Sequence, residues 1–260
     1  MRISVNAPSY RRPSKELRLD YLPFCRIWVD EAEAGEYKRN YQEADIVACP
    51  KGVQGNLCRV RNWILDREFE RGMDVVLIID DDLSRMERFV YRNGFGYERE
   101  RVRTEDFLPF VEKYSIMAED IGAKFWGVNC NSDHMAYRYT SPFSTVAYIG
   151  GPFQCFMKGN RCRYDEALPL KEDYDMTLQQ LNRERVILRV NMYHYICKQS
   201  ENVGGCATYR NRERERAQLM ALQKKWGSGI VKIDESNKGR TKKKKMFDYN
   251  PIINIPIKGI

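Results

Sequence analysis

A run of five apolar residues, Val75 to Ile79, leads directly into three aspartates, Asp80 to Asp82. A strand that is apolar at every position is buried on both faces, which is typical of a parallel sheet covered by helices. Neighbouring like charges roughly 6 Å apart repel by about 0.7 kcal/mol in water, and several-fold more in a protein cleft. Because three anions at the end of a buried strand need a compensating positive charge, the pattern indicates a bound divalent cation.

The segments before this run predict one α/β domain. Three further apolar runs end in proline or an acidic residue and are expected to be strands: 2–8, 24–31 and 44–50. Apolar residues repeat at helical spacing through 57–71, where Asn56 is placed to cap the start and Gly72 to end the helix. This β-α-β order favours a mostly parallel central sheet with flanking helices, whose ligands bind outside the carboxyl ends of the strands.

The later segments continue the same pattern. Helices are expected at 104–122, from 172 onward and at 208–227, strands at 123–131 and 187–198, and a broken pair of strands at 144–159. The last helix is strongly charged, and Ala217, Met220 and Ala221 are expected on its inner side. Residues 1–235 are therefore expected to form one domain. Residues 236–260, which include the lysine run Lys242 to Lys245, are expected to form a basic tail that is ordered only in part.

Composition limits the class of protein. The net charge of +8 favours an acidic partner such as nucleic acid, although a solvated basic surface explains it equally well. Eight cysteines without a C-x-x-C pair, and only two histidines, argue against a zinc site and fit free thiols in a reducing cytosol. No segment is apolar enough for a secretion signal or a membrane span, so a soluble intracellular protein is expected.

Two acidic groups are candidates for chemistry. Asp80 and Asp82 are expected to point to one side of an extended chain and could share one Mn²⁺ or Mg²⁺, while Asp81 points to the other. Glu172 and Asp173 begin a helix about 90 residues later, and one of them could act as a general base toward a hydroxyl nucleophile. The structural alternatives are a solvated loop for the first group and helix capping for the second.

Other candidates are basic or aromatic. His194 lies on an apolar strand and could be a third metal ligand, although a core histidine is the alternative, and Lys198 could neutralise a leaving diphosphate or simply be a surface lysine. Arg61, on the helix at 57–71, could recognise phosphate or could be surface charge. The loop Pro8–Arg12, with Tyr10 and Arg11, could stack on a base and bind phosphate, or be an exposed turn.

The ordered set of motifs resembles nucleotide-sugar transferases of the GT-A fold. The matching features are the loop "APSYRRP", a second strand ending in "VDE" with Asp30, "RN" with Arg61, "DDD" after the fourth strand, "ED" at Glu172–Asp173, and a late histidine. Within that fold, the stretches "RISVNAPSYRRP", "YLPFCRIWVDEAEAGEY", "GVQGNLCRVRNWILD" and "VVLIIDDDL" look like the TET-associated glycosyltransferases of bacteriophages.

The resemblance implies an activity and its partners. The family is understood to attach sugars to hydroxymethylated cytosines in phage DNA. It implies transfer of a sugar from a nucleoside diphosphate donor, such as a UDP-sugar, to the hydroxyl of 5-hydroxymethylcytosine. It further implies one bound Mn²⁺ or Mg²⁺, a DNA acceptor, no membrane, and a place in the cytoplasm of the bacterial host.

The resemblance also implies roles for individual residues. Asp80 and Asp82 would hold the metal and diphosphate, with Asp81 near the ribose. Asp173 would be the base, as in inverting members of the fold. The terminal histidine of the family would correspond to His194. The loop Pro8–Arg11 and the acid Asp30 would meet the uracil.

Three alternatives stay open from the residues themselves. The same carboxylates, Asp80, Asp82, Glu172 and Asp173, could hold two cations in a nuclease. A basic DNA-binding protein would use its acids only for capping and solvation, although the chain has no helix-turn-helix or zinc pattern. A glycosyltransferase acting on a protein or a glycan is the third.

Overall fold

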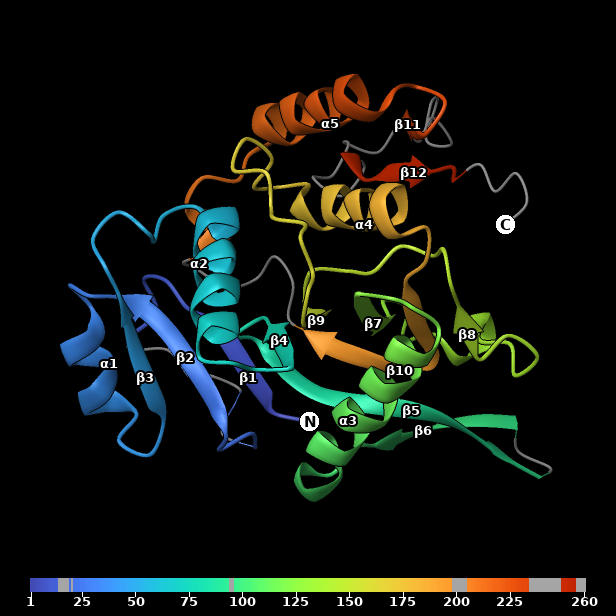
Figure 1. The fold of residues 1–260 in the computed structure, drawn as a ribbon, viewed down its shortest axis with the longest axis horizontal. Coiled ribbons are helices and arrows are strands. Elements are labelled where there is room, and N and C mark those ends of the chain that lie inside the picture. Colours follow the sequence, from blue (N-terminus) through green and yellow to red (C-terminus); the bar gives the residue numbers. More distant parts are fainter. Residues whose placement is uncertain (14–18, 20, 94–95, 198–204, 234–248, 256–260) are drawn as a thin grey trace.

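The computed structural model describes residues 1–13, 19, 21–93, 96–197, 205–233 and 249–255. Within them, a central sheet is covered by helices on both faces, and a further helix packs on the outside of one of these layers (Figure 1). Lys198 and the lysine run Lys242 to Lys245 lie outside the described residues. No helix of the described segments is long and apolar enough to cross a membrane.

Ten strands of the described chain form the central sheet in the order β3-β2-β1-β4-β9-β7-β10-β5-β6, with β8 paired to β10. Their bounds are β1 Ile3–Pro8, β2 Cys25–Asp30, β3 Asp45–Cys49, β4 Val75–Ile79, β5 Leu83–Arg92, β6 Gly96–Arg101, β7 Phe125–Asn129, β8 Phe143–Ser144, β9 Phe153–Met157 and β10 Leu188–Cys197. In this described sheet β5, β8 and β9 run against the other seven strands. The prediction of a mostly parallel sheet is therefore confirmed, with three antiparallel members added.

The helices are α1 Ala34–Asn40, α2 Leu57–Glu70, α3 Thr104–Asp120, α4 Glu172–Glu184 and α5 Arg212–Trp226. Helices α1 and α3 pack on one face of the sheet, whereas α2 and α4 pack on the other. Helix α5 lies over α4 through Leu219 and Leu222 (Figure 1). Beside them, the short strands β11 Val231–Ile233 and β12 Pro251–Ile253 pair with each other.

Strand β4 shows why its sequence is apolar throughout. Val75, Leu77 and Ile79 pack toward α3, while Val76 and Ile78 pack toward α2 and α4. All five are fully buried, because β4 has neighbouring strands on both sides and helices on both faces. The strand therefore delivers the aspartate triplet to the middle of one edge of the sheet.

The expected start and end of α2 are confirmed. The side chain of Asn56 accepts hydrogen bonds from the amides of Cys58 and Arg59, at 2.9 and 3.3 Å, and so satisfies two otherwise unpaired donors of the first turn. Gly72 follows the helix with a φ of +80°, which favours glycine at this position.

Two local expectations were wrong. Residues 145–149 are not a strand, and of the expected pair in 144–159 the structure has β9 and only the short β8 at its start. Ala217, Met220 and Ala221 are exposed on α5 rather than packed inward. The buried side of α5 is formed by Glu215, Leu219 and Leu222, because the charge of Glu215 is neutralised by partners in the core.

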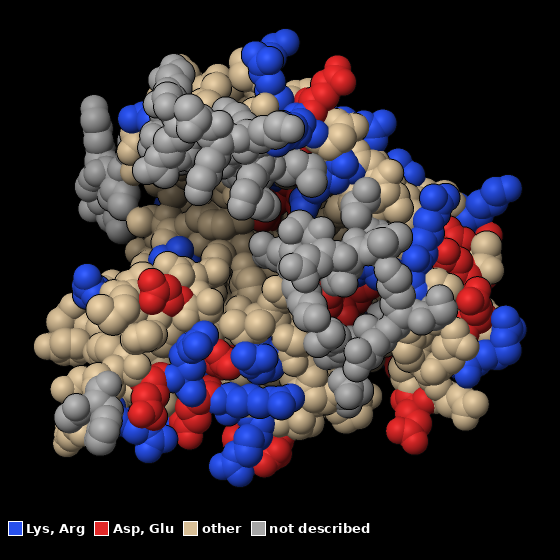
Figure 2. Space-filling model, turned by 180° about the vertical axis from the view of Figure 1, so that it is seen from behind, with Lys and Arg blue, Asp and Glu red and all other residues tan. Residues whose placement is uncertain are grey.

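The surface mixes the two signs of charge. Figure 2 shows Lys and Arg side chains next to Asp and Glu side chains over much of the face turned away from the view of Figure 1. On β5 and β6, for example, Arg88 is paired with Glu100 and Arg92 with Glu98, each at 2.6 Å. Such exposed pairs contribute little to stability, typically about 0–1 kcal/mol each.

Candidate active site

A cavity of about 340 Å³ lies at the edge of the sheet where β1 and β4 end. Its walls come from segments far apart in the sequence: 8–12, 54–60, 80–82, 148–152, 170–174 and 205–215. The aspartate triplet and the Glu172–Asp173 pair, predicted as two separate acidic groups, both line it. The fold therefore brings the two groups into one site.

The aspartate triplet forms a tight turn between β4 and β5. The amide of Leu83 donates to the carbonyl of Asp80 at 3.1 Å, so the three residues do not continue the strand as expected from the sequence. The side chain of Asp81 is buried, and it accepts hydrogen bonds from the hydroxyl of Ser9 at 2.7 Å and from the guanidinium of Arg12. Asp80 and Asp82 keep partial exposure and line the cavity.

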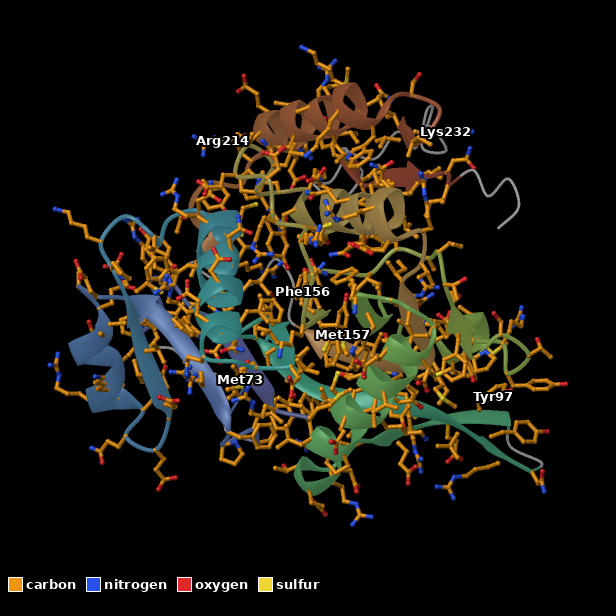
Figure 3. All side chains as sticks on the ribbon, in the orientation of Figure 1. Met73, Tyr97, Phe156, Met157, Arg214 and Lys232 are labelled. Carbon is orange, nitrogen blue, oxygen red and sulfur yellow. The ribbon has the colours of Figure 1, made fainter. Side chains whose placement is uncertain are left out.

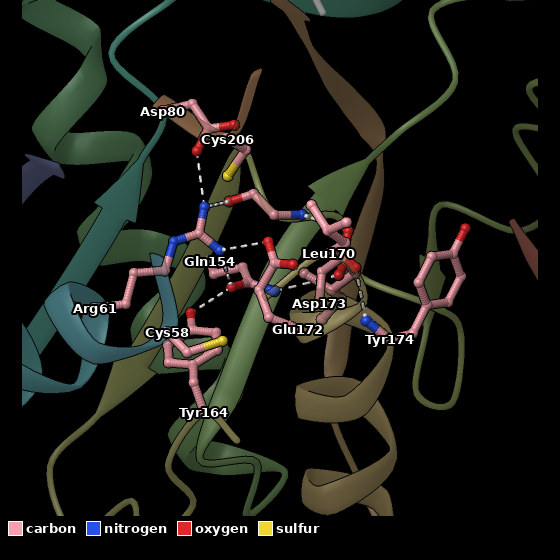
Figure 4. A network of polar contacts seen from close by, with 12 residues as sticks. Cys58, Arg61, Asp80, Gln154, Tyr164, Leu170, Glu172, Asp173, Tyr174 and Cys206 are labelled. Carbon is pink, nitrogen blue, oxygen red and sulfur yellow. Dashed lines mark hydrogen bonds and ion pairs between the residues drawn. The ribbon is translucent and has the colours of Figure 1, made fainter. Parts of the chain in front are cut away.

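Arg61 connects the two acidic groups. Its guanidinium is fully buried, and it donates to Asp80 Oδ1 at 2.7 Å and to the carbonyl of Gly151 at 3.1 Å. The other terminal nitrogen lies 3.4 Å from Glu172 Oε1 and from Gln154 Oε1 (Figure 4). A buried arginine that contacts both acidic side chains fixes them in place and supplies positive charge to Asp80.

Asp173 is held by three donors at the start of α4. Its Oδ2 accepts from the hydroxyl of Tyr148 and from the amide of Gly151 at 3.3 Å, and its Oδ1 accepts from the amide of Tyr174 at 2.8 Å. The rings of Tyr148 and Tyr174 stack with centroids 4.2 Å apart. The carboxylate is thus oriented at the cavity by hydrogen bonds and by a stacked aromatic pair.

The side chain of Glu172 is buried next to the carboxylate of Asp173. Burial, together with the negative charge of Asp173, raises the pKa of Glu172 to about 8, and Arg61 opposes this only in part. At neutral pH its side chain is therefore mostly protonated.

The loop after β1 only partly matches the expected donor site. Pro8 and Tyr10 line the cavity, as does Arg12, whereas Arg11 points outward and its guanidinium lies 5.0 Å from the Tyr10 ring centroid. Asp30 is half-exposed, is not among the residues that line the cavity, and accepts the amide of Ala32 at 2.9 Å.

The structure does not bring His194 to the aspartates. Its ring is completely buried on β10, 4.6 Å from the ring of Phe89, and its Nε2 lies 3.6 Å from Glu87 Oε2. Burial lowers the pKa of this imidazole. The position is that of a core histidine, and His194 is not among the residues that line the cavity.

Several side chains of the cavity were not expected from the sequence: Lys171, Tyr209, Arg210 and Glu215. Lys171 and Glu215 form a buried ion pair that joins the residue before α4 to the first turn of α5. Tyr209 carries no local sequence signal of a site. A charge pattern such as "RNRERER" is typical of a solvated helix, and only the tertiary structure shows that one of its glutamates is buried.

The donor atoms at the cavity fit a hard divalent cation. In the part of the chain that the structure describes, no group of three or more His, Cys, Asp and Glu side chains is arranged to hold a metal ion. Mg²⁺ typically takes only one or two carboxylates and completes its shell with water and substrate phosphates. Asp80, whose Oδ1 is bound to Arg61, and Asp82 supply such carboxylate oxygens at the cavity.

The model of a protein family described as TET-Associated Glycosyltransferase matches residues 24–205 of the chain. The match spans 182 of 260 residues, or 70% of the chain. It contains the aspartate triplet, Arg61 and the Glu172–Asp173 pair, but it ends before Tyr209 and Arg210. No curated protein sequence matches the chain.

Solved structures resemble the chain only distantly. TarS of S. aureus, residues 1–349 in complex with UDP, is 13% identical with a TM-score of 0.41, over 86% of this chain and 66% of that one. A CMP:2-keto-3-deoxy-manno-octonic acid synthetase bound to CTP is 10% identical with a TM-score of 0.43, over 86% and 100%. A197 from STIV is 12% identical with a TM-score of 0.40, over 78% and 89%. The fold assignment rests on the strand order and directions given above.

Proposed function

The chain belongs to the TET-associated glycosyltransferase family and is a glycosyltransferase, and we propose that it transfers a sugar from a nucleoside diphosphate sugar to a hydroxyl on modified DNA. The donor is a UDP-sugar and the acceptor hydroxyl is that of 5-hydroxymethylcytosine. One divalent cation, Mn²⁺ or Mg²⁺, takes part.

The observation that carries this proposal is the meeting of two acidic groups in one cavity. The turn at Asp80 to Asp82 and the start of α4 are about 90 residues apart in the chain, and Arg61 contacts both. Sugar transfer from a diphosphate needs a cation at the leaving group and a base at the incoming hydroxyl. Two acidic groups that line one cavity of about 340 Å³ suit these two tasks.

In this proposal Asp80 and Asp82 would hold the cation, which when bound would offset the negative charge of the leaving diphosphate. Arg61 fixes the Asp80 carboxylate through the 2.7 Å hydrogen bond to Oδ1. Asp173 accepts the proton of the attacking hydroxyl, oriented by its three hydrogen bonds. Glu172 stays protonated beside it, so that the cavity does not carry two adjacent negative charges. A base opposite the leaving group implies inversion at the anomeric carbon.

A transfer assay tests the proposal. Duplex DNA with 5-hydroxymethylcytosine, the same duplex with cytosine, and a protein substrate are each incubated with Mn²⁺ and a panel of labelled nucleotide sugars. Label is expected only in the hydroxymethylated duplex. Label in the protein substrate instead would assign a different acceptor.

A second incubation distinguishes a transferase from a nuclease. Plasmid DNA is incubated with Mn²⁺ and no nucleotide sugar, and the plasmid is expected to stay supercoiled. Nicking that disappears in Asp82→Asn would show that the carboxylates hold cations for phosphodiester cleavage.

A further inference from the structure

Three cations around the cavity are already paired with carboxylates. The pairs are Arg12 with Asp81, Arg61 with Asp80, and Lys171 with Glu215. The three cationic side chains retain 13%, 1% and 2% of their exposure, respectively. Because each charge is matched at short range, none of them can turn to a ligand without leaving a carboxylate of the cavity unpaired, and two of these carboxylates, Asp81 and Glu215, are buried.

Arg210 differs from these three. Its side chain lines the cavity and retains 35% of its exposure, and its Nε lies 3.0 Å from Glu215 Oε1. Its two terminal nitrogens make no hydrogen bond or ion pair with any residue in the described segments. Since Glu215 is shared with Lys171, one carboxylate serves two cations, and a positive charge remains at Arg210.

Local structure holds Arg210 at the cavity. The amide of Gly205 donates to the carbonyl of Tyr10 at 3.0 Å, which ties this segment to the loop after β1. The amide of Arg210 then closes a turn onto the carbonyl of Cys206 at 3.0 Å. Gly205 has a φ of +53°, and a Cβ there would lie 3.1 Å from Arg12, so glycine permits this close approach.

We propose that Arg210 binds a phosphate group of the nucleotide donor, and that Glu215 positions it. A guanidinium whose terminal nitrogens are unpaired offers the planar fork that suits phosphate oxygens. A cavity of about 340 Å³ accommodates a small ligand, whereas a DNA duplex does not fit inside it. Arg210 lies beyond residues 24–205, so this cation is not part of the region shared with the family. The inference rests on the proposed function, since it takes the donor to be a nucleoside diphosphate.

Nucleotide binding tests the inference without relying on activity. UDP, UMP and uridine are titrated with Mn²⁺ into the wild-type protein, Arg210→Ala and Arg210→Lys. A lost hydrogen bond to a charged group corresponds to about tenfold to 100-fold weaker binding of UDP in Arg210→Ala. Uridine affinity is expected to stay within about twofold, because uridine carries no phosphate. Arg210→Lys keeps the charge and is expected to recover part of the UDP affinity.

Arg214→Ala is the matched control. Arg214 is an exposed arginine four residues later, at the end of α5 nearest α2 (Figure 3), and it donates to the carbonyl of Tyr209 at 3.0 Å. This variant is expected to bind UDP like the wild type. Equal UDP affinity in Arg210→Ala and Arg214→Ala would overturn the inference, as would an equal loss of UDP and uridine.

Two further arms identify the source of the phosphate. If the wild-type protein binds no nucleoside diphosphate at all, the donor assignment fails, and this inference fails with it. If the Arg210→Ala variant binds UDP as well as the wild type does but binds an oligonucleotide duplex more weakly, Arg210 contacts the acceptor and its donor role is overturned.

Glu215→Gln is expected to weaken UDP binding less than Arg210→Ala does, because it misplaces the guanidinium of Arg210 without removing it.

Discussion

Replacing Glu172 by Gln should flatten the pH dependence of stability of the free enzyme. The Glu172 side chain retains only 10% of its exposure, and its pKa is raised from 4.5 to about 8 by burial and by the charge of Asp173. The folded protein therefore holds a proton that the unfolded chain releases. The stability that this proton contributes is complete below pH 4.5 and is lost as the pH rises through about 8.

The size of the effect follows from the number of protons. Between the two pKa values the folded state binds one proton more, so the free energy of unfolding falls by about 1.4 kcal/mol for each pH unit. From pH 5.5 to 7.5 the wild-type protein should lose about 3 kcal/mol through this one group. Glutamine has the same shape and does not titrate, so Glu172→Gln should lack that loss.

Urea unfolding at pH 5.5, 6.5 and 7.5, in EDTA and without nucleotide, measures both proteins. Glu166→Gln is the control, because Glu166 is an exposed carboxylate whose side chain retains 48% of its exposure beside Arg59. It should reproduce the wild-type pH profile. If the unfolding free energies of the wild type and Glu172→Gln changed in parallel with pH, Glu172 would be charged in the folded protein. The proposal that Glu172 stays protonated beside Asp173 would then be wrong.

Three further substitutions test other parts of the site. Asp82→Asn should abolish Mn²⁺-dependent sugar transfer while leaving the urea midpoint near the wild-type value, because Asp82 is partly exposed at the cavity; an unchanged rate would remove it from the metal site. Tyr148→Phe should slow transfer and leave UDP affinity intact, since it removes one donor to Asp173 but keeps the stacked ring; an equal loss of UDP affinity would contradict this. Asp175→Asn should cost about 2–4 kcal/mol of unfolding free energy, because the buried carboxylate binds Lys225 and Trp226 and so fixes α5 on α4; the exposed Glu213→Gln is its control, and an equal small effect in both would refute a docking role.

The parts of the fold that the sequence predicted are those with a local physical signal. Five consecutive apolar residues specify a strand buried on both faces, and Asn56 with Gly72 specifies the two ends of α2. The sequence did not predict the hairpin β5–β6, because its many charged residues obscure the alternation of apolar and polar residues that is typical of a strand. Arg88 and Glu100 are paired across that hairpin, which the sequence cannot show without the register.

The burial of single charged or polar residues depends on partners far away in the chain. Glu215 occurs in a charged helix and is nevertheless buried, because Lys171, 44 residues earlier, neutralises it. His194 is on an apolar strand, and whether its ring faces the metal or the core depends on the pairing of β10 with β5. The sequence therefore predicted that acids meet at the sheet edge, but not which cations accompany them.

The charges around the cavity give a physical reason for the cation in the proposed function. With Glu172 protonated, five charged carboxylates face four cations in the described structure. The carboxylates are Asp80, Asp81, Asp82, Asp173 and Glu215, and the cations are Arg12, Arg61, Lys171 and Arg210. A nucleoside diphosphate sugar adds two negative charges, so the filled site would carry a net charge of minus three in a partly desolvated space, where like charges repel strongly. One divalent ion at Asp80 and Asp82 reduces that surplus to minus one. Arg210 lowers the remaining repulsion where its terminal nitrogens meet the phosphates, so the cation and the arginine should act together on affinity for the diphosphate and leave the affinity for the nucleoside unchanged.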